Sequence, residues 1–180
     1  MRIWELTESR QNLVYRVDST KISDFEKNLK TYYHSDDWSQ SGSKWDDAAG
    51  SATGLYAHPS KLFVALYATG NANTNRYIAT YNTNPPTVYF DKKDVPKFKN
   101  NKSYLTTFDA DNFKKLPTGE VFSERPGNPV SQIEITDPFQ FIKQQGWSIE
   151  LVDDLPAKLK EIKKIAKRQN IKYGAEGLGI

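Results

Sequence analysis

The sequence predicts an α+β fold with a largely antiparallel core, in one domain that covers residues 1–180. The chain contains many short strand-like segments and a few helical ones, without a regular strand–helix alternation. Aromatic residues make up 13% of the chain, and such residues suit strands and stacked packing better than a Leu-rich bundle. At 180 residues the chain is long enough for a full core, and it contains no internal repeat or domain boundary.

The composition excludes several classes of site. The chain has no Cys, so disulfides, thiolate metal sites and Cys nucleophiles are excluded, and its two His cannot form an all-His zinc site. No apolar run approaches the length that spans a membrane. We therefore expect neither metal nor membrane among the partners. The net charge of +3 is too small to imply nucleic-acid binding by itself.

The N-terminal part predicts two strands, a helix and a long loop. Ile3 to Leu6 is a short edge-strand candidate, and Asn12 to Val17 is a stronger one with apolar residues on both sides of its arginine. Apolar residues at helical spacing predict an amphipathic helix over Ser23 to Tyr33. The polar stretch 34–53, which contains Trp38 and Trp45, is expected to be a loop whose tryptophans pack onto the body or serve a function.

The segment Gly54 to Gly70 places two tyrosines on either side of a turn. Leu55 to Ala57 predicts the end of a strand, and a proline-initiated helix is expected over Ser60 to Ala68. Tyr56 precedes the turn and Tyr67 lies on the helix, so the turn can bring both rings to one aromatic pocket.

The middle of the chain alternates short strands with turns. Alternating apolar residues or short apolar runs predict strands at Arg76–Tyr81, Thr87–Phe90, Ser103–Phe108, Glu120–Ser123 and Ser131–Ile135. Lys92 to Lys102 is basic and polar and contains a proline, so we expect a surface excursion. Asp109 to Gly119 predicts a short turn or helix before a Pro-Thr-Gly turn.

The last third predicts a helix over Pro138 to Gln145, a strand over Trp147 to Val152 and a helix over Pro156 to Asn170. The final helix has one apolar face, while its other positions carry Lys158, Lys160, Lys163, Lys164, Lys167 and Arg168. These cations form either a solvated face or a patch for an anionic partner such as nucleic acid. The tail from Tyr173 is expected to fray.

No phosphate-binding glycine loop, dinucleotide fingerprint, nucleophile elbow or metal-spaced cluster is present in the sequence. What remains is an arginine in an apolar strand, a tyrosine pair that flanks a turn, and a glutamate that opens a strand after a turn. These residues are Arg16, Tyr56, Tyr67 and Glu120.

Three segments resemble mono-ADP-ribosyltransferases. VYRVDS (Val14 to Ser19) resembles the opening strand of the cholera-toxin-like branch, and GEVFSERPGNPVSQI (Gly119 to Ile133) resembles the segment around that branch's catalytic glutamate. Tyr56 and Tyr67 are similar to the tyrosine pair of diphtheria-type toxins and poly-ADP-ribose polymerases. The three segments occur in the family's order. The resemblance implies an ADP-ribosyltransferase-like core of two packed sheets with flanking helices.

The resemblance implies that NAD is the co-substrate and that Glu120 is the catalytic carboxylate. Cleavage of the nicotinamide–ribose bond builds positive charge on the ribose, which a carboxylate stabilises. A fixed guanidinium suits the anionic pyrophosphate, and two tyrosine faces can sandwich the cationic nicotinamide. The residues expected at the site, besides Glu120, are Arg16, Tyr56, His58, Ser60 and Tyr67.

The sequence departs from the family pattern at two places and offers a second register. Thr118 occupies the place of the second glutamate of arginine-modifying toxins, which favours another acceptor. Ala57-His58-Pro59 occupies the place of a Ser-Thr-Ser motif. Gln132 and Glu134 resemble the Gln-x-Glu motif of other branches, so Glu134 is the alternative to Glu120 as the catalytic carboxylate.

The function expected from the resemblance is transfer of ADP-ribose from NAD to a macromolecule, a protein or a nucleic acid, by a bacterial toxin or effector. The alternatives are a transferase fold without turnover and an aromatic-rich binding module for protein, glycan or nucleic acid. The first residues, MRIWELTESR, do not resemble a secretory signal peptide. We therefore expect a cytoplasmic protein, or an effector that is translocated without such a signal into the cytoplasm of a target cell.

Overall fold

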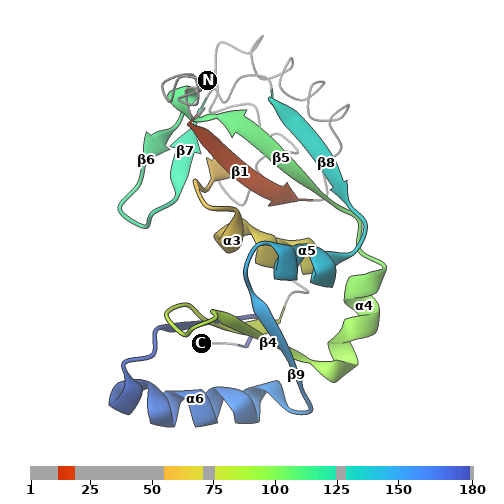
Figure 1. The fold of residues 1–180 in the computed structure, drawn as a ribbon, viewed down its shortest axis with the longest axis vertical. Coiled ribbons are helices and arrows are strands. Elements are labelled where there is room, and N and C mark those ends of the chain that lie inside the picture. The colour runs from red at the N-terminus through yellow and green to blue at the C-terminus, as the bar shows by residue number, and fades with distance from the viewer. Residues whose placement is uncertain (1–11, 19–54, 71–75, 125–128, 179–180) are drawn as a thin grey trace, which may run out of the picture. The chain divides into compact units, whose positions relative to one another are not determined.

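The structure is a computed structural model that describes residues 12–18, 55–70, 76–124 and 129–178 (Figure 1). The predicted strand at 3–6, the predicted helix at 23–33 and the loop 34–53 lie outside the described residues. The chain groups into two compact units. Unit 1 comprises Met1–Arg16, Lys21–Ser60 and Thr106–Gln132, and unit 2 comprises Val17–Thr20, Lys61–Leu105 and Ile133–Ile180. The expectation of a single domain stays a prediction.

Short strands and helices make up the described residues. The strands are β1 (Leu13–Asp18), β2 (Leu55–Ala57), β3 (Tyr77–Thr80), β4 (Thr87–Asp91), β5 (Ser103–Asp109), β6 (Lys114–Lys115), β7 (Val121–Ser123), β8 (Ser131–Ile135), β9 (Ser148–Val152) and β10 (Tyr173–Glu176). The α-helices are α3 (Lys61–Val64), α4 (Val95–Lys99), α5 (Pro138–Gln144) and α6 (Leu155–Gln169). The 3₁₀ helices are η2 (Ala65–Thr69), η3 (Lys92–Asp94) and η4 (Ala110–Asn112).

The strands form sheets in the orders β1-β5-β8, β10-β3-β4-β9 and β2-β7-β6. The pairs β10–β3, β3–β4, β2–β7 and β6–β7 are antiparallel, and β4–β9 is parallel. The α+β prediction with a mostly antiparallel core is confirmed. The described strands form three sheets, where two were expected. The sheets of β1 and β2 stay separate because β1 and β2 meet through one isolated bridge, between Tyr15 and His58, instead of a continuous ladder.

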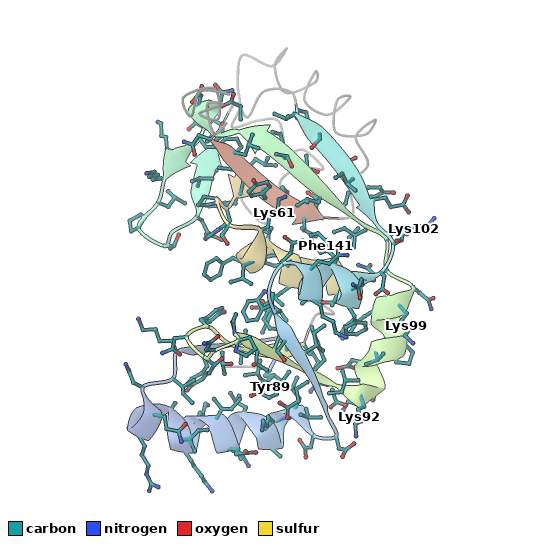
Figure 2. All side chains as sticks on the ribbon, viewed as in Figure 1. Lys61, Tyr89, Lys92, Lys99, Lys102 and Phe141 are labelled. Carbon is teal, nitrogen blue, oxygen red and sulfur yellow. The ribbon has the colours of Figure 1, made fainter. Side chains whose placement is uncertain are left out.

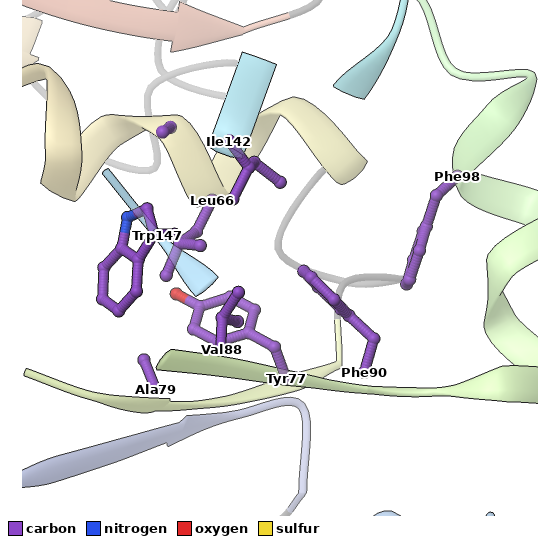
Figure 3. Packing of buried hydrophobic residues seen from close by; sticks show 9 residues of the cluster. Leu66, Tyr77, Ala79, Val88, Phe90, Phe98, Ile142 and Trp147 are labelled. Atoms are coloured by element: carbon purple, nitrogen blue, oxygen red, sulfur yellow. The ribbon is translucent and has the colours of Figure 1, made fainter. Parts of the chain in front are cut away.

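In unit 2, the sheet β10-β3-β4-β9 is covered by helices on both faces (Figure 1). One face packs against η2 and α5 through Leu66, Tyr77, Phe90, Ile142 and Trp147, which Figure 3 shows in contact as one buried cluster. The other face packs against α6, whose buried side chains Leu155, Leu159 and Ile162 cover Ile78 of β3. Alternate residues of β3 therefore serve two different cores, which explains why the whole strand is buried.

Within the described residues, unit 1 has a buried apolar cluster on one side of β2 and β7. Its buried members are Val14, Leu55, Ala57, Phe108 and Val121. Ala110 and Phe113 pack against this cluster from the edge. The strands β1, β2, β5 and β7 thus share apolar side chains, and this packing fixes the backbone from which the candidate site residues project.

The tail differs from its prediction because β10 pairs with β3. Asn170 adopts a left-handed conformation with φ 52° and ends α6, after which the chain returns along β3. The register joins Tyr173 to Thr80 and Glu176 to Tyr77. The frayed-tail prediction is therefore wrong for Tyr173–Glu176, since the open edge of β3 supplies hydrogen bonds that the weak local pattern of the tail did not reveal.

The surface excursion predicted at Lys92 to Lys102 is largely exposed and contains the short helices η3 and α4. Asp91 begins η3 by accepting a hydrogen bond from the Lys93 N–H at 3.1 Å. Burial alone would raise the pKa of Asp91, but hydrogen bonds from Lys93 and Leu155 and the charge of Lys93 outweigh it and lower the pKa. The proline lies in the first turn of α4, where no N–H is needed, and Phe98 anchors α4 in the core.

The helix predicted over Ser60 to Ala68 is confirmed in position, but its second half is the 3₁₀ helix η2. Carbonyl groups in η2 accept hydrogen bonds from side chains. The Ala68 carbonyl accepts hydrogen bonds from the side chains of Asn101 and Ser103, both at 3.3 Å. The Thr69 hydroxyl donates to the Leu66 carbonyl at 2.9 Å, which stabilises the tighter turn.

Candidate active site

The antiparallel pair β2–β7 has a core face and a second face with a different composition. Leu55 lies opposite Ser123, Tyr56 opposite Phe122, and Ala57 opposite Val121. Directly opposed residues of an antiparallel pair project to the same face, and successive residues alternate between faces. Leu55, Ala57, Val121 and Ser123 are buried on the core face, whereas Tyr56 and Phe122 project together to the second face and are half-buried.

Continuing this register by one residue places His58 opposite Glu120. Each follows the strand's alternation, so both belong to the face of Tyr56 and Phe122. A Cβ atom at Gly119 would lie 3.8 Å from Nε2 of His58, which places the ring beside the turn that precedes Glu120. The Glu120 carboxylate is also close enough to oppose the lowering of the His58 pKa. We call this set, Tyr56, His58, Glu120 and Phe122, the second face.

His58 is held by its backbone and by its ring. Its N–H and carbonyl form the bridge with Tyr15, with N···O distances of 2.9 and 2.8 Å. The Ser60 N–H donates to Nδ1 of the ring at 2.9 Å, so the proton of the neutral ring resides on Nε2. Burial lowers the pKa of His58 below 6.5, and the nearby Glu120 carboxylate opposes this effect. The ring is therefore neutral at pH 7 and carries its N–H on the nitrogen that lies beside the Glu120 turn.

A tight turn delivers Glu120 to the start of β7. The Leu116 N–H donates to the Glu120 carbonyl at 2.9 Å, and the Gly119 N–H donates to the Leu116 carbonyl at 3.1 Å. Gly119 has φ +90°, a conformation that L side chains rarely adopt. The Thr118 hydroxyl lies 3.5 Å from Oε2 of Glu120 and 3.4 Å from its backbone nitrogen. Thr118 thus contacts the carboxylate from the position where the resemblance places a second glutamate in arginine-modifying toxins.

Arg16 lies where β1 and β2 diverge. Next to the bridge between Tyr15 and His58, the Tyr56 carbonyl accepts a hydrogen bond from Nη1 of Arg16 at 2.9 Å. The half-buried guanidinium is therefore fixed to the same strand that carries Tyr56 and His58. A planar guanidinium presents five N–H donors in a fixed geometry that suits carboxylate and phosphate groups.

Five of the predicted site residues belong to unit 1: Arg16, Tyr56, His58, Ser60 and Glu120. Tyr67 lies on η2 in unit 2, with 42% of its surface exposed, close enough to Tyr77 to contribute to the raised pKa of that phenol. The division between the units falls directly after Ser60. The predicted slot between Tyr56 and Tyr67 therefore stays a prediction.

The alternative catalytic residues, Gln132 and Glu134, also belong to different units. Nε2 of Gln132 donates to the Thr106 hydroxyl at 2.8 Å, which ties β8 to β5 in unit 1. Glu134 is exposed on β8 and belongs to unit 2. Of the two candidate carboxylates, Glu120 is the one with a histidine and a threonine beside it among the described residues.

Comparison with known proteins gives no match: no protein-family model, curated protein or solved structure is similar to the chain. Within the residues that the structure describes, no three His, Asp or Glu side chains gather as they would to hold a metal ion. None of the helices described is long and apolar enough to cross a membrane.

Sequence reasoning missed two members of the site. Phe122 packs against Tyr56 with ring centroids 5.0 Å apart and an interplanar angle of 53°. Its position two residues after Glu120 on a strand was a usable signal, because such residues share a face. The sequence indicated only that Thr118 stands at the place of a glutamate of arginine-modifying toxins. Its contact with Glu120 depends on the turn conformation at Gly119.

Proposed function

We propose that the protein is an NAD-dependent mono-ADP-ribosyltransferase, which cleaves the nicotinamide–ribose bond and transfers ADP-ribose to a macromolecule. The observation that carries the proposal is the opposition of His58 and Glu120 on one face of β2 and β7, beside Tyr56. A carboxylate, a neutral imidazole donor and an aromatic ring are the groups that this reaction needs around the ribose and the nicotinamide.

Glu120 would act on the ribose. As the bond from C1′ to the nicotinamide nitrogen breaks, the electron pair leaves with nicotinamide and positive charge develops on the sugar. The half-buried carboxylate can stabilise this charge and accept a hydrogen bond from the 2′-hydroxyl group. The Thr118 hydroxyl, 3.5 Å from Oε2, helps to orient the carboxylate without neutralising it.

His58 would act as a neutral hydrogen-bond donor. Because the Ser60 N–H occupies Nδ1, the ring presents Nε2–H on the side of Glu120, where a ribose hydroxyl would also lie. The lowered pKa keeps the ring uncharged at pH 7. A protonated ring would pair with Glu120 and weaken its stabilisation of the sugar cation, so the activity is expected to fall as the pH decreases toward the His58 pKa.

Arg16 and Tyr56 would hold the pyrophosphate and the nicotinamide of NAD. The positive charge of the Arg16 guanidinium suits the anionic pyrophosphate, and the bond to the Tyr56 carbonyl fixes the side chain for that task. The Tyr56 ring is half-buried and backed by Phe122, so one of its faces can stack on the cationic nicotinamide.

The acceptor is proposed to be a macromolecule, and a role as a toxin or effector follows from the resemblance. Thr118 stands where arginine-modifying members carry a second glutamate. A hydroxyl group cannot serve as the general base that such a glutamate provides. We therefore propose an acceptor other than a protein arginine, either another side chain of a protein or a nucleic acid.

The proposal is tested by incubating the purified protein with NAD that carries a label in its adenosine half, with and without a cell lysate. We expect release of nicotinamide, measured by chromatography, and transfer of the label to one class of macromolecule, identified by mass spectrometry. NAD binding without nicotinamide release would mean that the protein has a transferase fold that binds NAD without turnover. Absence of any NAD binding would contradict the proposal altogether and favour an aromatic-rich binding module.

A further inference from the structure

Helix α6 of unit 2 carries more positive charge than its own packing requires. It contains six cationic side chains and a single carboxylate, whereas the whole chain has an excess of only three positive charges. Lys158 and Glu161 form an ion pair with an N···O distance of 3.3 Å. The Lys158 ammonium also lies 5.0 Å from the centroid of the Tyr89 ring, which is labelled in Figure 2. The five remaining cations form no such contact with any other residue that the structure describes.

These five cations share one face of the helix. At 3.6 residues per turn they fall within an arc of about 140°, on the side opposite to the buried residues Leu155, Leu159, Ile162 and Ala166. All five are exposed, and among the described residues none forms an ion pair with a carboxylate. We call this set the basic stripe; its members are Lys160, Lys163, Lys164, Lys167 and Arg168.

We propose that the basic stripe binds the phosphate backbone of a nucleic acid, without selecting bases. The stripe extends over about 12 Å of helix at 1.5 Å per residue. The same length of duplex DNA carries about seven phosphate charges. Five adjacent ammonium and guanidinium groups are complementary to such a row of charges, and their flexible side chains can follow it.

The stripe fits a nucleic acid better than a membrane or a protein. A helix that binds a bilayer inserts its apolar face, and the apolar face of α6 is buried against Ile78 of β3. Lysine is depleted at the centres of protein interfaces, whereas four of the five stripe residues are lysines without an apolar residue among them. Contacts of cations with phosphates dominate sequence-independent binding to DNA.

The test is the affinity of the intact chain for a fluorescein-labelled 20-base-pair duplex, measured by anisotropy between 25 and 200 mM KCl. Five phosphate contacts predict that the logarithm of the association constant falls with the logarithm of salt at a slope of about −4.5. The triple variant Lys160→Gln, Lys164→Gln, Lys167→Gln keeps two cations of the stripe, and its slope should be about −2. Glutamine is compatible with helix, so circular dichroism should be unchanged.

A matched control removes three other exposed lysines of unit 2: Lys99, Lys102 and Lys143. Their substitution by glutamine lowers the net charge equally and should leave the slope near the wild-type value. Substituting the same three stripe lysines by arginine should also preserve binding.

Three outcomes would overturn the proposal: no binding at 25 mM KCl, equal losses in the stripe variant and the control, or binding to phosphatidylserine vesicles without binding to the duplex. The inference does not depend on the proposed activity, because release of nicotinamide from free NAD requires no nucleic acid. Failure of either experiment therefore leaves the other one intact.

Discussion

At the scale of single residues, His58 and Glu120 form a pair whose two charges depend on each other. The ring lies half-buried, with Nδ1 occupied by the Ser60 N–H, and the carboxylate stands across the strand pair. Burial favours the neutral ring, and the carboxylate favours the protonated one. The balance leaves a neutral donor beside Glu120 at pH 7, which suits a site that has to stabilise a cation of the substrate.

The His58 ring should titrate with a midpoint below 6.5 in an NMR experiment on the intact protein. Glu120→Gln should lower the midpoint further, because it removes the negative charge that stabilises the imidazolium. Glu134→Gln removes the same charge from an exposed position of β8 and should leave the midpoint unchanged. A midpoint at or above 6.5 would contradict the dominance of burial, and a midpoint that does not respond to Glu120→Gln would contradict the proximity of the pair.

The same shift makes the stability of the fold depend on pH in a known direction. Between the lowered pKa of His58 and 6.5, the folded protein binds fewer protons than the unfolded chain, so the free energy of unfolding rises with pH in that window. The loss of this stabilisation begins as the pH falls below 6.5 and is complete below the pKa of His58 in the folded state. In urea unfolding between pH 5 and 7, His58→Gln should reduce this dependence; an unchanged dependence in the variant would show that His58 is not its source.

At the scale of elements, the turn from Leu116 to Glu120 sets the geometry of the carboxylate. Gly119 has φ +90°, and the space beside it is open enough for a methyl group, since a Cβ atom would lie 3.8 Å from His58. The cost of a side chain there is therefore backbone strain and not a steric clash. Gly119→Ala should destabilise the protein by about 1–2 kcal/mol in urea unfolding.

A matched substitution on the same segment is Lys115→Ala on β6, which is exposed and should change the free energy of unfolding by less than about 0.5 kcal/mol. Equal effects of the two substitutions would mean that Gly119 is not needed for the turn.

The first turn of α6 is a second element with a testable contribution. Asp154 accepts a hydrogen bond from the Ala157 N–H at 3.0 Å and caps the helix. Asp154→Ala should therefore reduce the free energy of unfolding by about 1 kcal/mol. The neighbouring Asp153 forms only an exposed ion pair with Lys92, so Asp153→Ala should cost less than about 0.5 kcal/mol. A larger effect at Asp153 than at Asp154 would contradict the assignment of the cap.

Most strands could be predicted because their apolar residues alternate or run together, as in β3 and β5. The strand β10 could not, since YGAE has little apolar pattern and becomes a strand only because the edge of β3 is open. The opposition of His58 and Glu120 could not be predicted either. Local periodicity states which residues share a face of one strand, but the register between two strands that are distant in the sequence is set by tertiary packing.

At the scale of the whole molecule, the two proposals belong to different compact units. Unit 1 carries the second face with Glu120, and unit 2 carries the basic stripe on α6. Unit 2, which carries the stripe, is built on a sheet whose two faces are covered by helices. This division predicts that substitutions in the stripe change the binding of a nucleic acid and leave the cleavage of free NAD unchanged.

The decisive measurement is the rate of nicotinamide release from saturating NAD by the wild type, by Glu120→Gln and by Glu134→Gln. Both substitutions replace a carboxylate by an amide of the same size, so they form a matched pair. We expect Glu120→Gln to lower the rate by about 100-fold or more, with NAD binding retained, and Glu134→Gln to keep the wild-type rate. A wild-type rate in Glu120→Gln, or loss of the activity in Glu134→Gln alone, would contradict the assignment of Glu120 as the catalytic carboxylate.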